Sequence, residues 1–144
     1  MQTNVVKRDT ANLIYILNSN GIHEFIVKQS SRTAVDEIMS VFGELYDSTA
    51  SDQILRRLFI MQPGVRLPSV AYTIGQTRQL LAKHKKPPKS RNALIYEDSV
   101  ALSILRPSVR FLPFANAMPL GFFRTNEREQ AITWLLDQPS APRT

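Results

Sequence analysis

The chain has 144 residues, with 43% hydrophobic and 21% charged side chains and a net charge of +6, which is typical of one soluble globular domain with its own core. No apolar run approaches the roughly 18 residues of a membrane span, and the first residues lack the apolar stretch of a signal peptide. The absence of cysteine excludes disulfides, thiolate metal sites and cysteine nucleophiles, and it fits a cytoplasmic protein. We expect a single domain over 1–144, with flexible tails at 1–11 and 138–144.

The first predicted elements form a β-hairpin. Apolar, β-branched runs over 12–17 and 22–29 flank the dipeptide Asn20-Gly21, which is a strong signal for a tight turn between antiparallel strands.

A helix is predicted next, over 30–47, because its apolar residues recur at helical spacing. Thr33 is the predicted N-cap, which would place Asp36 and Glu37 in the first turn, near the positive end of the helix dipole. These two carboxylates and Glu44 show no catalytic spacing, so we interpret them as solvated helix surface.

The middle of the chain predicts a strand, a turn and a second helix. The unbroken apolar run within 55–61 is typical of a strand buried on both faces of a parallel sheet. Pro63 ends that strand, and Pro68 or Ser69 begins a helix whose last turn carries the cations of 83–86.

Two further strand–helix units are predicted in the last third of the chain. Asp98 or Ser99 would cap the first of the two helices, which Pro107 would kink, and Asn126 would cap the last one. Pro119 favours an edge position or a strand start for the last strand. The units are the strand 92–97 with the helix 100–112, and the strand 118–123 with the helix 127–137.

The resulting order is ββαβαβαβα. A hairpin followed by alternating helices and strands predicts an α/β domain with a mostly parallel five-stranded sheet, an N-terminal antiparallel hairpin and four helices.

Several features carry a resemblance to a known family. They are the opening hairpin, the helix that ends in Leu80-Leu81, and the strand and capped helix over 122–135 with Ala131, Trp134 and Leu135 facing inward. Over residues 12–137 the chain resembles the STAS superfamily of anti-sigma factor antagonists, in particular small stand-alone bacterial STAS-like proteins. The resemblance implies a non-enzymatic regulatory module that binds a protein or a ligand.

The resemblance also implies a switch position. Members of this family carry a phosphorylatable serine or threonine at the start of the second helix, usually after an aspartate. Ser69 occupies that position, but the chain reads Arg66-Leu-Pro-Ser69 and lacks the aspartate. A phosphate on Ser69 would meet a helix N-terminus with Arg66 nearby, and the alternative is a plain N-cap.

Positive charge is concentrated in the middle of the chain, where residues 53–126 carry a net charge of +10. Such asymmetry could serve an anionic partner, namely an acidic protein surface, a lipid headgroup or nucleic acid, or it could be a solvated surface. Nucleic acid is the weakest of these options, because no aromatic residue interleaves the basic segment. The basic segment consists of Lys83, Lys85, Lys86, Lys89 and Arg91.

No catalytic or metal-binding pattern is present in the sequence. The two histidines, His23 and His84, lack metal-ligand spacing, and there is no nucleophile elbow, dinucleotide fingerprint or Walker motif. We therefore expect neither an enzyme nor a cofactor.

An apolar group surrounds the predicted third helix and the strand after it. It could cover a small apolar cavity or a dimer patch, or it could be ordinary core. Its members are Phe111, Leu112, Phe114, Met118, Phe122 and Phe123.

Three functions follow from these features. The first is a regulatory module that binds a protein partner, with an acidic surface, through the loop and helix start near Ser69. The second is a carrier of a small apolar or lipid ligand in a pocket near the third helix, and the third is weak nucleic-acid binding through the basic segment 83–91. Homodimerisation is a further option.

Overall fold

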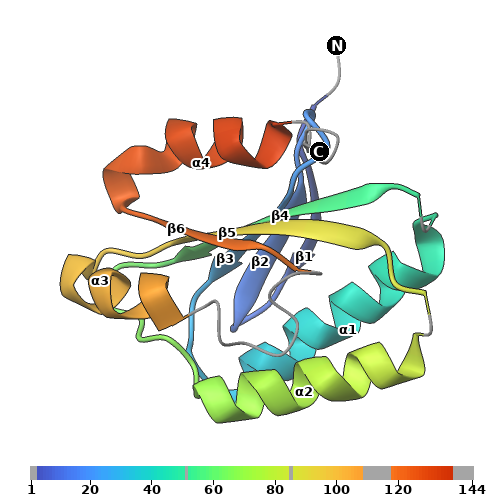
Figure 1. Ribbon diagram of the computed structural model, residues 1–144, viewed down its shortest axis with the longest axis horizontal. Coiled ribbons are helices and arrows are strands. Elements are labelled where there is room, and N and C mark those ends of the chain that lie inside the picture. Colours follow the sequence, from blue (N-terminus) through green and yellow to red (C-terminus); the bar gives the residue numbers. More distant parts are fainter. Residues whose placement is uncertain (1–2, 51, 85, 109–117, 138–144) are drawn as a thin grey trace, which may run out of the picture.

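The computed structural model describes residues 3–50, 52–84, 86–108 and 118–137. Within these ranges the chain forms one six-stranded sheet with helices on both faces; α1 and α2 cover one face, α4 lies on the other, and α3 lies beside β6 (Figure 1). The elements are β1 (Val5–Asp9), β2 (Leu13–Leu17), β3 (His23–Val27), α1 (Arg32–Ser48), β4 (Ile54–Met61), α2 (Val70–Lys83), β5 (Lys89–Ile95), α3 (Ser99–Ser108), β6 (Leu120–Phe123), the short 3-10 helix η2 (Thr125–Glu127) and α4 (Arg128–Leu136).

The strands are ordered along the sheet as they are along the chain. The first three are antiparallel neighbours, and β3, β4, β5 and β6 are parallel neighbours. The predicted hairpin is confirmed: Leu13 pairs with Val27, and Gly21 has a φ of 86° in the turn between β2 and β3. The α/β class, the N-terminal hairpin and the four predicted helices are therefore present.

The predicted number of strands was wrong, because β1 adds a sixth. Its residues Val5–Asp9 were assigned to a flexible tail. Three of its five residues are charged, and every residue except Arg8 is exposed, so the run lacks the apolar alternation that indicates a strand. Pairing with β2, from Val5 with Leu17 to Asp9 with Ile14, extends the sheet at this edge.

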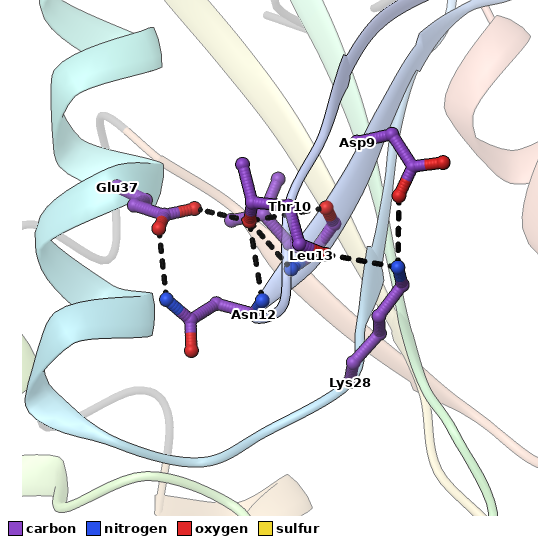
Figure 2. A network of polar contacts seen from close by, with 6 residues as sticks. All are labelled: Asp9, Thr10, Asn12, Leu13, Lys28 and Glu37. Carbon is purple, nitrogen blue, oxygen red and sulfur yellow. Dashed lines mark hydrogen bonds and ion pairs between the residues drawn. The ribbon is translucent and has the colours of Figure 1, made fainter.

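A polar network fixes the turn between β1 and β2 against α1 (Figure 2). Thr10 donates from its hydroxyl to one carboxylate oxygen of Glu37 (2.7 Å), and the Asn12 side-chain amide donates to the other (2.8 Å). The Lys28 ammonium, just after β3, bridges Asp9 (2.8 Å) and the Thr10 carbonyl (2.9 Å). Glu37 is therefore a structural partner of the hairpin, although its position on α1 predicted a solvated side chain.

Some predicted helix starts differ from the structure. Ser31, not Thr33, caps α1, because its hydroxyl accepts a hydrogen bond from the Ala34 amide (3.1 Å). Asp36 and Glu37 consequently lie in the second turn. At the other end of the chain a 3-10 turn precedes α4, and the Glu127 carboxylate accepts a hydrogen bond from the Arg124 amide (2.7 Å), so Asn126 is not the cap.

Other predicted boundaries are confirmed. Ser69 caps α2 and Asp98 caps α3, whose Ala101 amide donates to the Asp98 carboxylate at 3.0 Å. Pro107 lies in the last turn of α3. The predicted continuation of that helix to Leu112 lies outside the described residues.

Two apolar layers hold the sheet between its helices. On one face, Phe25 and Leu55 pack with Phe42 of α1; on the other, Leu58 and Ala93 pack with α4. The middle strand β4 contributes to both layers, as the apolar run predicted. In the described part of the chain, no helix is long and apolar enough to cross a membrane.

Candidate functional site

A cavity of about 290 Å³ lies between the α1–α2 layer and the parallel strands. Its walls are predominantly aliphatic and aromatic, and they come from both helices, from four strands and from the loop before α2. Residues that represent these walls are Ile38, Phe42, Ile74, Leu94, Leu120 and Phe122.

Small side chains on α2 leave this space between the helix and the sheet. Thr73 and Thr77 face the cavity, and their short side chains fill less of it than leucine would. The hydroxyls of both residues donate to carbonyls of the helix itself, at 2.8 Å to Ser69 and at 2.8 Å to Thr73. Their methyl groups are thus the part available to a ligand. Val70, at the start of α2, also lines the cavity, although its side chain is 55% exposed.

A buried arginine borders the cavity. Arg57 of β4 is 0% exposed, and its guanidinium carbon lies 4.0 Å from the centre of the Phe42 ring. Its Nε donates to the side-chain oxygen of Asn92 on β5 (2.7 Å). Phe42 and Asn92 both belong to the cavity wall. The two terminal nitrogens of Arg57, Nη1 and Nη2, have no hydrogen-bond partner among the described residues.

The amide of Asn92 is held in one orientation. Its nitrogen donates to the Ser90 hydroxyl (3.1 Å) and to the Pro119 carbonyl (3.3 Å), which directs its oxygen toward Arg57. Burial lowers the pKa of Arg57, while the neighbouring Tyr46 hydroxyl favours the charged form. The guanidinium is therefore positioned by neutral groups.

His23, Arg57 and Asn92 are neighbours on three adjacent strands and form a polar row across the sheet. His23 pairs with Arg57 in the β3–β4 register, as Arg57 pairs with Asn92 in the next. Burial, followed by the positive charges of Arg57 and Lys7, lowers the pKa of His23 to about 4, and its Nδ1 lies 2.7 Å from the Tyr15 hydroxyl. A neutral His23 accepts that hydrogen bond and adds no charge beside Arg57.

The other histidine has a separate environment. His84 places Nε2 3.1 Å from the Asp47 carboxylate and Nδ1 2.9 Å from the Leu80 carbonyl, and its ring packs edge-on against Tyr46. Across the described ranges, no group of three or more histidine, aspartate or glutamate side chains could hold a metal ion.

Ser69 and Arg66 lie at the carboxyl end of the parallel strands. Both side chains are exposed, and the Ser69 hydroxyl accepts a hydrogen bond from the Tyr72 amide (3.3 Å), which is ordinary N-cap geometry. Arg66 borders an open depression together with Leu67, Tyr96 and Ile104 of α3.

The structure divides the basic segment. Lys83, Lys86 and Lys89 are exposed near the amino end of β5, whereas Arg91 is half-buried, with its guanidinium carbon 4.2 Å from the centre of the Trp134 ring on α4. Lys85 lies outside the described residues. Strand β5 begins at Lys89, three residues before the predicted start, so Arg91 belongs to the sheet and not to a basic loop.

The predicted apolar group is divided as well. Phe111, Leu112 and Phe114 lie outside the described residues. Met118 and Phe122 line the cavity, and Phe123 packs against Trp134 on the opposite face of the sheet. The cavity itself lies under α1 and α2, and α3 contributes none of its described wall.

Sequence reasoning did not identify Arg57 or Asn92 as functional residues. Arg57 follows Arg56 near the start of its predicted strand, and Asn92 was the first residue of another. Polar residues are common at such positions. The available signal was a pair of arginines inside a central strand whose other residues are apolar, because a buried charge is rare unless it has a partner.

The chain matches no protein-family model, no curated protein and no solved structure. The STAS-like resemblance therefore stays a prediction that rests on the order of elements and on the C-terminal strand and helix.

Proposed function

We propose that this protein is a non-enzymatic carrier or sensor that binds a small apolar molecule in the cavity between α1, α2 and the sheet. The observation that carries the proposal is the cavity itself, about 290 Å³ with mainly apolar walls. This volume is close to the lower end of the range for small-molecule sites, which are also concave and mostly apolar.

The chemistry of the walls favours an apolar occupant over water. The Thr73 and Thr77 hydroxyls are already bonded to helix carbonyls, so they contribute few free hydrogen-bonding groups to the cavity. A buried water needs two to four polar partners, whereas an apolar molecule gains about 25 cal/mol for each Å² of apolar surface removed from water.

Native mass spectrometry of the purified protein and calorimetric titration with 1-decanol test this proposal. We expect a co-purifying apolar molecule or saturable decanol binding, and we expect Ile74→Phe, which places a larger ring in the cavity, to weaken binding at least tenfold. Ile104→Phe is the matched control, because Ile104 is 66% exposed on α3 and lies outside the cavity wall. Failure of decanol to bind, or equal binding by Ile74→Phe, would contradict the proposal.

A second candidate function is binding of a protein partner at the carboxyl end of the parallel strands. Three large apolar side chains are exposed on the helices that begin there: Val70 at 55%, Val100 at 68% and Ile104 at 66%. Ile104 and Arg66 border the same depression, next to the loop that leads to Ser69. Clustered exposed apolar residues with a polar rim are typical of interaction sites.

Affinity capture with purified bait tests this second function. A partner retained by the wild type should be lost with Ile104→Asp and kept with Leu136→Asp, a matched change at a 39% exposed position on α4. If both variants lose the partner, or if both retain it, the partner does not bind through this surface.

A further inference from the structure

We infer that the molecule bound in the cavity carries a carboxylate, and that the guanidinium of Arg57 binds this group while the walls hold an apolar chain. This inference rests on the proposed function, because it assigns the chemical class of the ligand for the same cavity. The class is a medium-chain monocarboxylic acid.

Two hydrogen-bond donors of Arg57 are unsatisfied. Nη1 and Nη2 are fully buried and have no hydrogen-bond partner among the described residues. Buried polar groups are nearly always hydrogen-bonded, and a buried cation that lacks an anionic partner is strongly unfavourable. A guanidinium in this state has donors available for a group that the described chain does not supply.

The second step is the absence of a counter-ion for Arg57 within the described residues. Its polar neighbours are Asn92, Tyr46 and His23, and the buried His23 remains neutral at pH 7. Three carboxylates of β3 and α1 have other partners: Glu24 pairs with Arg128, Glu44 pairs with Arg8, and Asp47 contacts the His84 ring.

The third step is the position of Arg57 relative to the cavity. It contacts two residues of the wall, Phe42 and Asn92, without forming part of the wall itself. Because the guanidinium is 0% exposed and lies behind Phe42 and Asn92, the carboxylate would reach its terminal nitrogens when one of these two side chains moves aside. The planar fork of an arginine matches the two oxygens of a carboxylate, which makes a paired, charge-assisted interaction.

The fourth step concerns charge and size. One guanidinium balances one negative charge, so a monocarboxylate fits better than a dianionic phosphate monoester. A cavity of 150 Å³ can hold benzene, so a cavity of about 290 Å³ accommodates on the order of ten to twelve non-hydrogen atoms. A chain of about ten carbons meets this limit.

The test compares decanoate with 1-decanol, which share a chain and differ in charge, in calorimetric titrations at pH 7. Wild type should bind decanoate ~10- to 100-fold more tightly than decanol, as expected for a buried charge-assisted pair. Arg57→Met should bind decanoate no more tightly than decanol, because the carboxylate then lacks a partner, and it should keep the decanol affinity within about threefold. Arg57→Lys should restore part of the preference, because it retains the charge without the fork.

Each outcome is decisive. Equal affinity of wild type for the two ligands, or a full preference in Arg57→Met, overturns the assignment of a carboxylate to Arg57. Decanol binding without a preference leaves the proposed apolar cavity intact, and failure of both ligands overturns the cavity proposal as well. If Arg57→Met does not fold, Arg57→Lys decides, since an unchanged preference in that variant excludes the paired geometry.

Discussion

Arginines on neighbouring positions of the sheet have different roles because successive side chains of a strand point to opposite faces. Arg56 donates from Nε to the Leu135 carbonyl near the end of α4 (2.7 Å), on the face opposite Phe42. Arg57, the next residue, packs against Phe42 on the α1 face, and Arg91 stacks on Trp134 beside α4. One of the three therefore adjoins the cavity, and the other two support the opposite layer.

Stability of the protein should depend on the protonation of His23. The pKa of His23 is lowered from 6.5 to about 4 in the folded state, mainly by burial. The folded state therefore binds fewer protons than the unfolded state, so stability is fully present above pH 6.5 and is lost as the pH falls toward 4. The shift sets an upper limit of about 3 kcal/mol, and the partial exposure of the ring reduces it to about 1–2 kcal/mol.

Urea unfolding of wild type and His23→Gln between pH 4 and pH 7.5 measures this dependence. The variant should lose most of the decrease in unfolding free energy over this range. Tyr15→Phe serves as the control, because it removes the hydrogen bond to His23 and keeps the titrating ring. A wild-type stability that does not change between pH 6.5 and pH 4.5 would contradict the prediction.

Contacts between elements determine how firmly the edge strand β1 is held. Glu37 of α1 receives hydrogen bonds from Thr10 and Asn12 at the turn between β1 and β2 (Figure 2). We expect Glu37→Ala to lower the free energy of unfolding by about 1–3 kcal/mol, because two donors lose a charged acceptor. Amide hydrogen exchange within β1 should accelerate more than exchange within β4.

Glu129→Ala is the matched control for this change. Glu129 is an exposed carboxylate on α4 without a hydrogen bond or ion pair in the described part of the chain. If both variants lose the same stability, or if exchange in β1 is unaffected by Glu37→Ala, the network does not anchor the strand.

Ser69 is the N-cap of α2. Its hydroxyl accepts a hydrogen bond from the Tyr72 amide, so Ser69→Ala should cost about 1 kcal/mol in thermal or urea unfolding. Ser69→Asp should keep wild-type stability, because aspartate is an equally good N-cap and adds a negative charge at the positive end of the helix. A neutral Ser69→Ala change would show that the cap contributes nothing measurable.

In the whole molecule, the cavity is space that side chains could fill, so the room that it gives a ligand is packing that the core lacks. Ile74→Phe fills part of that space and should raise the free energy of unfolding by about 0.5–2 kcal/mol while it weakens decanol binding. The same change at the exposed Ile104 should alter stability by less than about 0.5 kcal/mol. A destabilised Ile74→Phe variant would mean that the walls cannot accommodate a larger ring.

Local signals predicted most of the elements. The turn at Asn20-Gly21, the caps at Ser69 and Asp98 and the apolar run of β4 depend on residues close together in the sequence, and each is present. Strand β1 was missed, because its stability comes from pairing with β2 and from Glu37 on a later helix. The STAS-like relationship and the functions derived from it stay predictions.

The candidate site was much less predictable than the fold. Phe122 and Met118 were identified as possible cavity residues, and both lie in the wall, although the cavity is under α1 and α2 and not under α3. The predicted basic segment is not one surface, because Arg91 faces Trp134 on the α4 side of the sheet.

Periodicity, turn residues and capping residues act over a few positions, so they were enough to predict the α/β class, the N-terminal hairpin and the two-sided burial of β4. The cavity between α2 and the sheet, and the place of Arg57 behind its wall, follow from how the layers pack. Both features depend on residues far apart in the chain, namely Thr77, Phe42 and Asn92. The volume left between packed elements and the partners of a buried charge are properties of the assembled layers.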